Sequence, residues 1–177
     1  MITLTDAALS RLRDRLVAKG ERQSMVFPVA AGHKNSASVG EAMHVVEEYG
    51  AICEAMYLVM VADKKVANSE RAVLRGALRI LSRDVVRSSH IESMVDIAAQ
   101  KLAKDGIERR LERVIEKLRA DPGKAEVTYI LAAAIAAADN KVTNEEQAML
   151  ARLGDALGID ERRANELLAE LGEDTKV

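Results

Sequence analysis

The sequence is poor in aromatic residues, proline and cysteine. Among its 177 residues there is no Trp, one Phe and three Tyr, together 2% of the chain. A core must then be packed from aliphatic and small side chains, which suits helices that lie close together. Only Pro28 and Pro122 can interrupt a helix, so long helices are permitted. Because 49% of the residues are apolar, the chain can bury a core, and we predict an all-α fold.

Several functional classes lack their usual signals. The single cysteine, Cys53, cannot form an internal disulfide and fits a reducing compartment. A net charge of −2 and the scarcity of aromatic rings argue against nucleic-acid binding. No run approaches the ~18 apolar residues of a membrane span, and no signal peptide is evident, so we expect a cytoplasmic protein. Without a phosphate loop, nucleophile elbow or zinc-protease motif, we expect no enzymatic activity.

Hydrophobic periodicity predicts a bundle of about eight helices. An amphipathic helix at 5–19, ended by Gly20, precedes an irregular linker, and together they form a segment over 1–37. A helical domain over 38–172 follows, and 173–177 is a frayed tail. Gly50 is expected to kink or divide the first helix of that domain. The helices predicted within it cover residues 38–62, 68–82, 88–103, 107–119, 123–138, 144–157 and 160–171.

One eight-residue string occurs twice in the chain. DKKVANSE at 63–70 matches DNKVTNEE at 139–146 in five positions without a gap. In each copy an Ala-rich apolar run precedes the Asp, and a helical pattern follows the Glu. We interpret this as a duplicated helix-turn-helix, with repeats near 50–82 and 127–171. A pseudo-two-fold arrangement of the repeats would bring the two turns to related positions in one bundle.

These strings resemble the signature of the TerB-like tellurite-resistance family: Ala-Asp, two residues, Val, three residues and Glu. The pattern starts at Ala62 in the first copy and at Ala138 in the second, and the resemblance extends over roughly residues 40–171. It implies an all-helical domain of two pseudo-repeated halves that acts in bacterial stress responses. It also implies a divalent cation held by acidic residues, and protein partners that are membrane-associated. The residues that match the family's acidic positions are Asp63, Glu70, Asp139 and Glu146.

This sequence departs from the family pattern at one position of each turn. The family commonly has Gly after the Asp, whereas Lys64 and Asn140 stand here. Asn tolerates a left-handed backbone conformation better than Lys does. Lys64 also places a positive charge beside a proposed cation ligand, so the first copy is the less typical site.

The four carboxylates support two interpretations. Their oxygens are ligands that a hard cation of the Ca²⁺ or Mg²⁺ class prefers, whereas a soft metal would need thiols. In the structural alternative, the aspartates accept backbone hydrogen bonds in their turns, and Thr143 with Glu146 forms a capping box. Ala67 replaces that Thr in the first copy, so Glu70 lacks its box partner. A third and weaker hypothesis is a metal-dependent hydrolase.

An arginine series recurs at intervals of four and supports an alternative function. Within a helix that spacing forms a drifting stripe able to hold an acidic partner. A metal-free adaptor bundle would use this Arg-rich face for protein contact, although a solvated face is the commoner reason for such a pattern. Like charges at this spacing repel, so we expect counter-charges nearby. The series consists of Arg71, Arg75, Arg79, Arg83 and Arg87.

Overall fold

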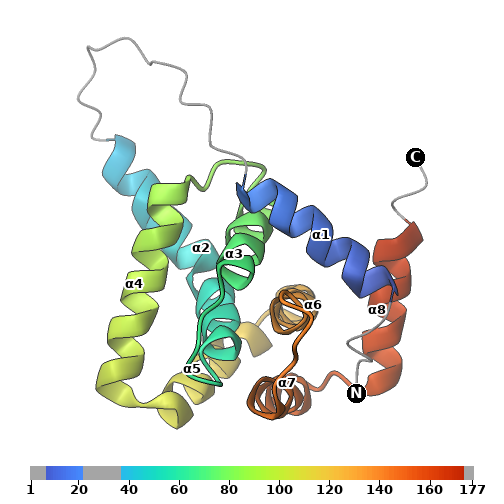
Figure 1. Ribbon diagram of the computed structural model, residues 1–177. Coiled ribbons are helices and arrows are strands. Elements are labelled where there is room, and N and C mark those ends of the chain that lie inside the picture. Colours follow the sequence, from blue (N-terminus) through green and yellow to red (C-terminus); the bar gives the residue numbers. More distant parts are fainter. Residues whose placement is uncertain (1–6, 22–36, 174–177) are drawn as a thin grey trace.

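A computed structural model describes residues 7–21 and 37–173 of the chain. The described segments contain helices and turns but no strand, which confirms the predicted all-α class. Most of the predicted linker, residues 22–36, and the predicted frayed tail from residue 174 lie outside them. Within the described ranges there are eight helices: α1 (Ala7–Glu21), α2 (Ala37–Met60), α3 (Asn68–Leu81), α4 (Ser88–Asp105), α5 (Ile107–Arg119), α6 (Pro122–Ala136), α7 (Asn144–Leu157) and α8 (Glu161–Glu173) (Figure 1).

Helices α2 and α6 form the centre of the bundle. Every residue from Thr128 to Ala138 is buried, so no side of α6 faces solvent over this stretch. A helix that is apolar all round must be surrounded by others, and α6 contacts all the helices except α4. Helix α2 runs unbroken through Gly50 and packs against α3, α4, α5, α6 and α7. In the described part of the chain, no helix is both long and apolar enough to cross a bilayer.

Helices α1 and α3 meet at two glycines. A Cβ atom on Gly20 would lie 1.9 Å from the carbonyl oxygen of Ala72, and one on Gly76 would lie 1.9 Å from that of Leu16. Neither position can hold a side chain unless the helices move apart. We expected Gly20 to end the first helix, but α1 includes it and continues to Glu21. The residue therefore serves a close helix crossing, and α1 packs directly on the domain that follows.

One buried ion pair connects α2 with α5. Arg110 donates from Nε to Oε1 of Glu54 at 2.6 Å and from Nη2 to Oε2 at 3.0 Å. Its Nη1 donates to Asp105 at 3.0 Å, and this bond lowers the pKa of the Asp105 carboxyl. Because both oxygens of Glu54 are engaged, its charge is compensated inside the bundle. Glu54 also lines a cavity that lies between α2, α4 and α5.

Candidate functional site

The two motif copies form the α2–α3 and α6–α7 turns, and their aspartates have the same local role. Asp63 Oδ1 accepts a hydrogen bond from the Lys65 backbone N–H at 2.8 Å. Asp139 Oδ1 accepts the equivalent bond from Lys141 at 2.9 Å. Both are short side-chain turns of the kind that Asp favours. This part of the structural interpretation is confirmed: each aspartate commits one oxygen to its own turn.

The residue after each aspartate has a left-handed backbone. The φ angle is 64° at Lys64 and 61° at Asn140. That conformation suits Gly best and is tolerated better by Asn than by Lys, so Lys64 is the more strained of the two. Asn140 is also held from outside its turn, because Arg13 of α1 donates to its Oδ1 and, at 3.2 Å, to the carbonyl oxygen of Ala137.

The two glutamates cap the helices that follow the turns. In α7 the box is complete: Glu146 Oε2 accepts from the N–H and the hydroxyl of Thr143, each at 2.8 Å, and the Thr143 hydroxyl accepts from the Glu146 N–H at 3.2 Å. In α3 only half of it exists. Glu70 accepts from the Ala67 N–H, but Ala67 has no side-chain oxygen to return a bond. Capping is therefore a confirmed role of both glutamates, as the sequence indicated for the second.

Glu70 and Glu146 also contact each other. Their side chains lie within hydrogen-bonding reach of each other, and the residues are 5% and 4% exposed. An ionised carboxylate can only accept hydrogen bonds, so one member of the pair must carry a proton when they are bonded. The structure thus brings together one acidic residue from each motif copy.

The surroundings of Glu70 favour its protonated form. Burial is the largest cause, and the bond to Glu146 and the negative charges of Glu146 and Asp139 act in the same direction. The hydrogen bond from the Ala67 N–H opposes them. Together these effects raise the pKa of the Glu70 carboxyl from its ordinary value of 4.5 to about 7. Near neutral pH the Glu70 carboxyl therefore changes between its protonated and ionised forms.

The four predicted ligands do not meet at one point. In the described ranges, no three His, Cys, Asp or Glu side chains are grouped so that they could hold a metal ion. Glu70 and Glu146 are in contact, and Asp139 is near enough to act on the charge of Glu70. A divalent cation is compatible with this pair, because it would replace the shared proton and neutralise two buried carboxylates. The remaining ligands would then be water, which Mg²⁺ in particular retains.

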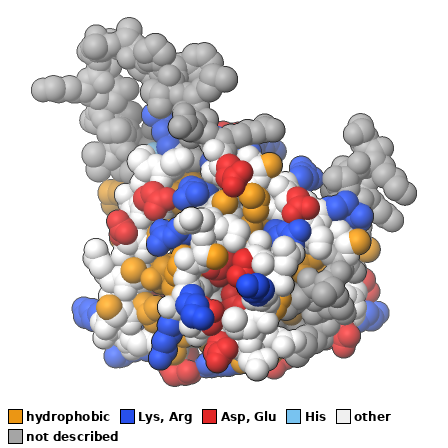
Figure 2. Space-filling model, viewed as in Figure 1, with side chains coloured by type: hydrophobic (Ala, Val, Ile, Leu, Met, Phe, Trp, Pro, Cys, Tyr) orange, Lys and Arg blue, Asp and Glu red, His pale blue; other side chains and the backbone are white. Residues whose placement is uncertain are grey.

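The first three arginines of the series form ion pairs within the molecule. Arg71 and Arg75 of α3 pair with Glu92 of α4, at 3.9 Å and 3.4 Å. Arg79 is 7% exposed and pairs with Asp84 at 3.2 Å. The expected counter-charges are therefore present. Figure 2 shows basic and acidic side chains interspersed over the face that it draws, with no extended patch of one sign.

Comparison with known proteins agrees with the motif. The profile of the family described as "Tellurite resistance protein TerB" matches residues 49–169, which include both turns. No curated protein and no solved structure matches the chain. Since the matched span is well over half of the 177 residues and contains the paired glutamates, the chain belongs to the TerB family of tellurite-resistance proteins.

Proposed function

We propose that this TerB-family protein is a non-enzymatic component of a tellurite-resistance-type stress response that binds a divalent cation and docks on partner proteins. The cation is of the Ca²⁺ or Mg²⁺ class, and its principal ligands are Glu70 and Glu146. The observation that carries the proposal is the contact between these two buried carboxylates, one from each motif copy.

The proposal follows from what two buried carboxylates require. Two negative charges in contact repel strongly away from water, so the pair needs either a proton or a cation. Oxygen ligands select a hard cation over a soft one. A site with two carboxylates, completed by water, is the kind that Mg²⁺ commonly occupies. Asp63 and Asp139 support this site by shaping the two turns, and Asp139 adds negative charge beside Glu70.

Partner docking is proposed for the surface around the turns. Val66, the motif valine of the first copy, is 38% exposed, and Lys64 and Lys65 beside it are exposed as well. An apolar side chain flanked by charges, close to the acidic pair, offers a contact surface whose electrostatics would change when a cation replaces the proton.

The test is isothermal titration of metal-stripped protein with Ca²⁺, Mg²⁺, Mn²⁺ and Zn²⁺. We expect saturable binding of a hard cation, lost in the double variant Glu70→Gln, Glu146→Gln. Gln keeps the capping bonds to the backbone, so this variant should stay folded by circular dichroism. Glu145→Gln is the matched control, because Glu145 is an exposed carboxylate in the same first turn of α7.

The pH dependence gives a second measurement on the same protein. Because a cation must displace the shared proton, affinity should rise between about pH 6 and pH 8, with release of about one proton per ion bound. Titrations in buffers of different ionisation enthalpy would measure that release. Absence of saturable binding for every cation, or equal binding in the double Gln variant, would contradict the proposal and leave the glutamates as helix caps.

A further inference from the structure

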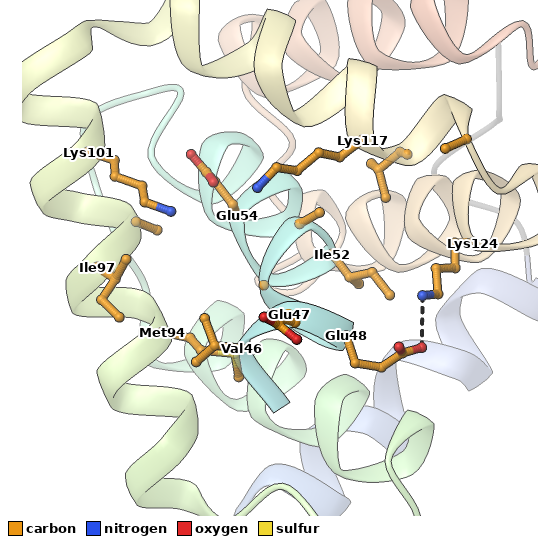
Figure 3. Close-up of a pocket in the computed structure, with 15 residues that line it drawn as sticks. Val46, Glu47, Glu48, Ile52, Glu54, Met94, Ile97, Lys101, Lys117 and Lys124 are labelled. Carbon is orange, nitrogen blue, oxygen red and sulfur yellow. Dashed lines mark ion pairs between the residues drawn. The ribbon is translucent and has the colours of Figure 1, made fainter. Parts of the chain in front are cut away.

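A cavity lies between α2, α4, α5 and the start of α6 (Figure 3). Its volume is about 490 Å³, within the range of about 300–1,000 Å³ that is usual for small-molecule sites. It shares no residue with the glutamate pair, so it does not depend on the function proposed above. Apolar side chains from three helices form much of its lining: Val46, Ile52, Met94, Ile97 and Leu118.

Some of the charged residues in the lining are already paired. Lys124 of α6 contacts Glu48 of α2 at 2.8 Å, which raises the pKa of the Lys124 ammonium group. Glu54 is held through both oxygens by Arg110. In Figure 3 the Glu48–Lys124 pair lies at one end of the cavity and Glu54 toward the other. Neither carboxylate therefore needs a ligand to compensate its charge.

Two lysines of the lining have no such compensation. Lys101 extends from α4 and Lys117 from α5, and in Figure 3 their ammonium groups lie on either side of the Glu54 carboxylate, whose charge Arg110 already compensates. Within the described ranges, neither lysine forms an ion pair. Glu47, the remaining acidic residue of the lining, forms none there either. Together, the two lysines and Glu47 carry one net positive charge, and this charge lies beside the apolar part of the lining.

We propose that this cavity binds a small anionic amphiphile, a molecule with one carboxylate or similar head group on an apolar chain. The head group is held by Lys101 and Lys117, whose flexible stems let the ammonium groups turn away from Glu54 and toward the ligand. The chain covers the apolar floor toward Ile97 and Val46. Each of these two side chains is 37% exposed, so a ligand would remove apolar surface from water.

Decanoate and the uncharged decanol are suitable probes, because they differ in the head group and share the chain. We expect isothermal titration to show one decanoate bound per chain. Decanol should bind with an affinity at least about tenfold lower. The double variant Lys101→Gln, Lys117→Gln should lose about tenfold in decanoate affinity and bind decanol as the parent does. Lys104→Gln is the control, since Lys104 is an exposed lysine on the same helix, outside the lining.

A second variant tests the apolar part of the site. Ala51 lines the cavity and is half-buried, so Ala51→Leu should fill space in the cavity and weaken decanoate and decanol alike. Circular dichroism would establish that each variant folds. Equal affinity for the two probes, full decanoate binding by the double Gln variant, or association with anionic vesicles but not with free decanoate would each overturn the proposal.

Discussion

The two turns of this protein reach the same backbone conformation with different side chains. Each has an Asp that accepts an N–H two residues on, a left-handed residue after it, and a Glu that accepts the N–H of the residue before the next helix. The residues that differ decide how well each turn is supported. Shared carboxylates thus determine the shape of the turns, and the variable positions determine their stability and contacts.

The second turn is the better supported of the two. Thr143 completes its capping box, and Arg13 of α1 holds Asn140 from outside. The first turn has Ala67 at the cap and Lys64 in the left-handed region, and its valine is exposed. Substitutions that give one turn the residue type of the other should therefore change the unfolding free energy in opposite directions in the two turns.

The largest expected effect concerns the glutamate pair in metal-free protein. The raised pKa of Glu70 means that this group stabilises the folded state fully below about pH 4.5 and that the contribution is lost as the pH rises through about 7. Glu70→Gln should therefore change the unfolding free energy little at about pH 5 and raise it by about 1–3 kcal/mol at about pH 8. Urea denaturation with a chelator present measures both values.

Glu146→Gln sharpens this comparison. It removes one neighbour of Glu70 but leaves the burial of Glu70, the largest cause of its raised pKa, in place. Its stabilising effect at high pH should therefore be smaller than that of Glu70→Gln. Equal effects of Glu70→Gln at both pH values would show that the pair does not share a proton in solution.

The next effect concerns the caps. Thr143→Ala should lower the unfolding free energy by about 1 kcal/mol, because the α7 box loses the hydroxyl that bonds to Glu146 in both directions. Ala67→Thr should raise it by a similar or smaller amount by completing the box in α3. Thr143→Ser keeps the hydroxyl and is the control. Destabilisation by Ala67→Thr would mean that the α3 cap has no room for the added side chain.

The smallest effect concerns the left-handed residues. Lys64→Gly should raise the unfolding free energy by about 0.5 kcal/mol, because relief of left-handed strain exceeds the entropy that Gly adds to the unfolded chain. Asn140→Gly should lower it by about 0.5–1 kcal/mol, because Asn tolerates the conformation and the bond from Arg13 is lost. Thermal denaturation of the matched pair measures the difference. Stabilisation by both changes would mean that the contact with Arg13 contributes nothing.

Local signals predicted the helices well where periodicity and caps agreed. The helices expected at 107–119 and 144–157 have those bounds in the structure. Gly106, which has a positive φ, precedes the first, and a capping box and the left-handed Gly158 bound the second. Gly20 shows the limit of such signals. A glycine at the end of an amphipathic pattern indicates a helix terminus, but here the missing side chain permits a close crossing with α3.

The sequence pointed to the four candidate carboxylates and to part of their local geometry. The repeat located all four carboxylates, and turn chemistry anticipated the backbone bonds of the aspartates. The contact between Glu70 and Glu146 joins residues 76 positions apart, so no local pattern could show it. One feature of the sequence indicates the buried pair of Glu54 and Arg110. Glu54 stands inside an apolar run, and a charged residue that is buried there requires a partner.

The sequence by itself determined the all-α class, the positions of the helices and the chemistry available at each turn. These depend on hydrophobic periodicity, caps and side-chain hydrogen bonds that act over a few residues. Only the tertiary structure decided that the two glutamates meet, that Gly20 and Gly76 let α1 pack closely on α3, and that two lysines from different helices face one cavity. Each of these is a contact between distant segments, and close packing of helices sets it.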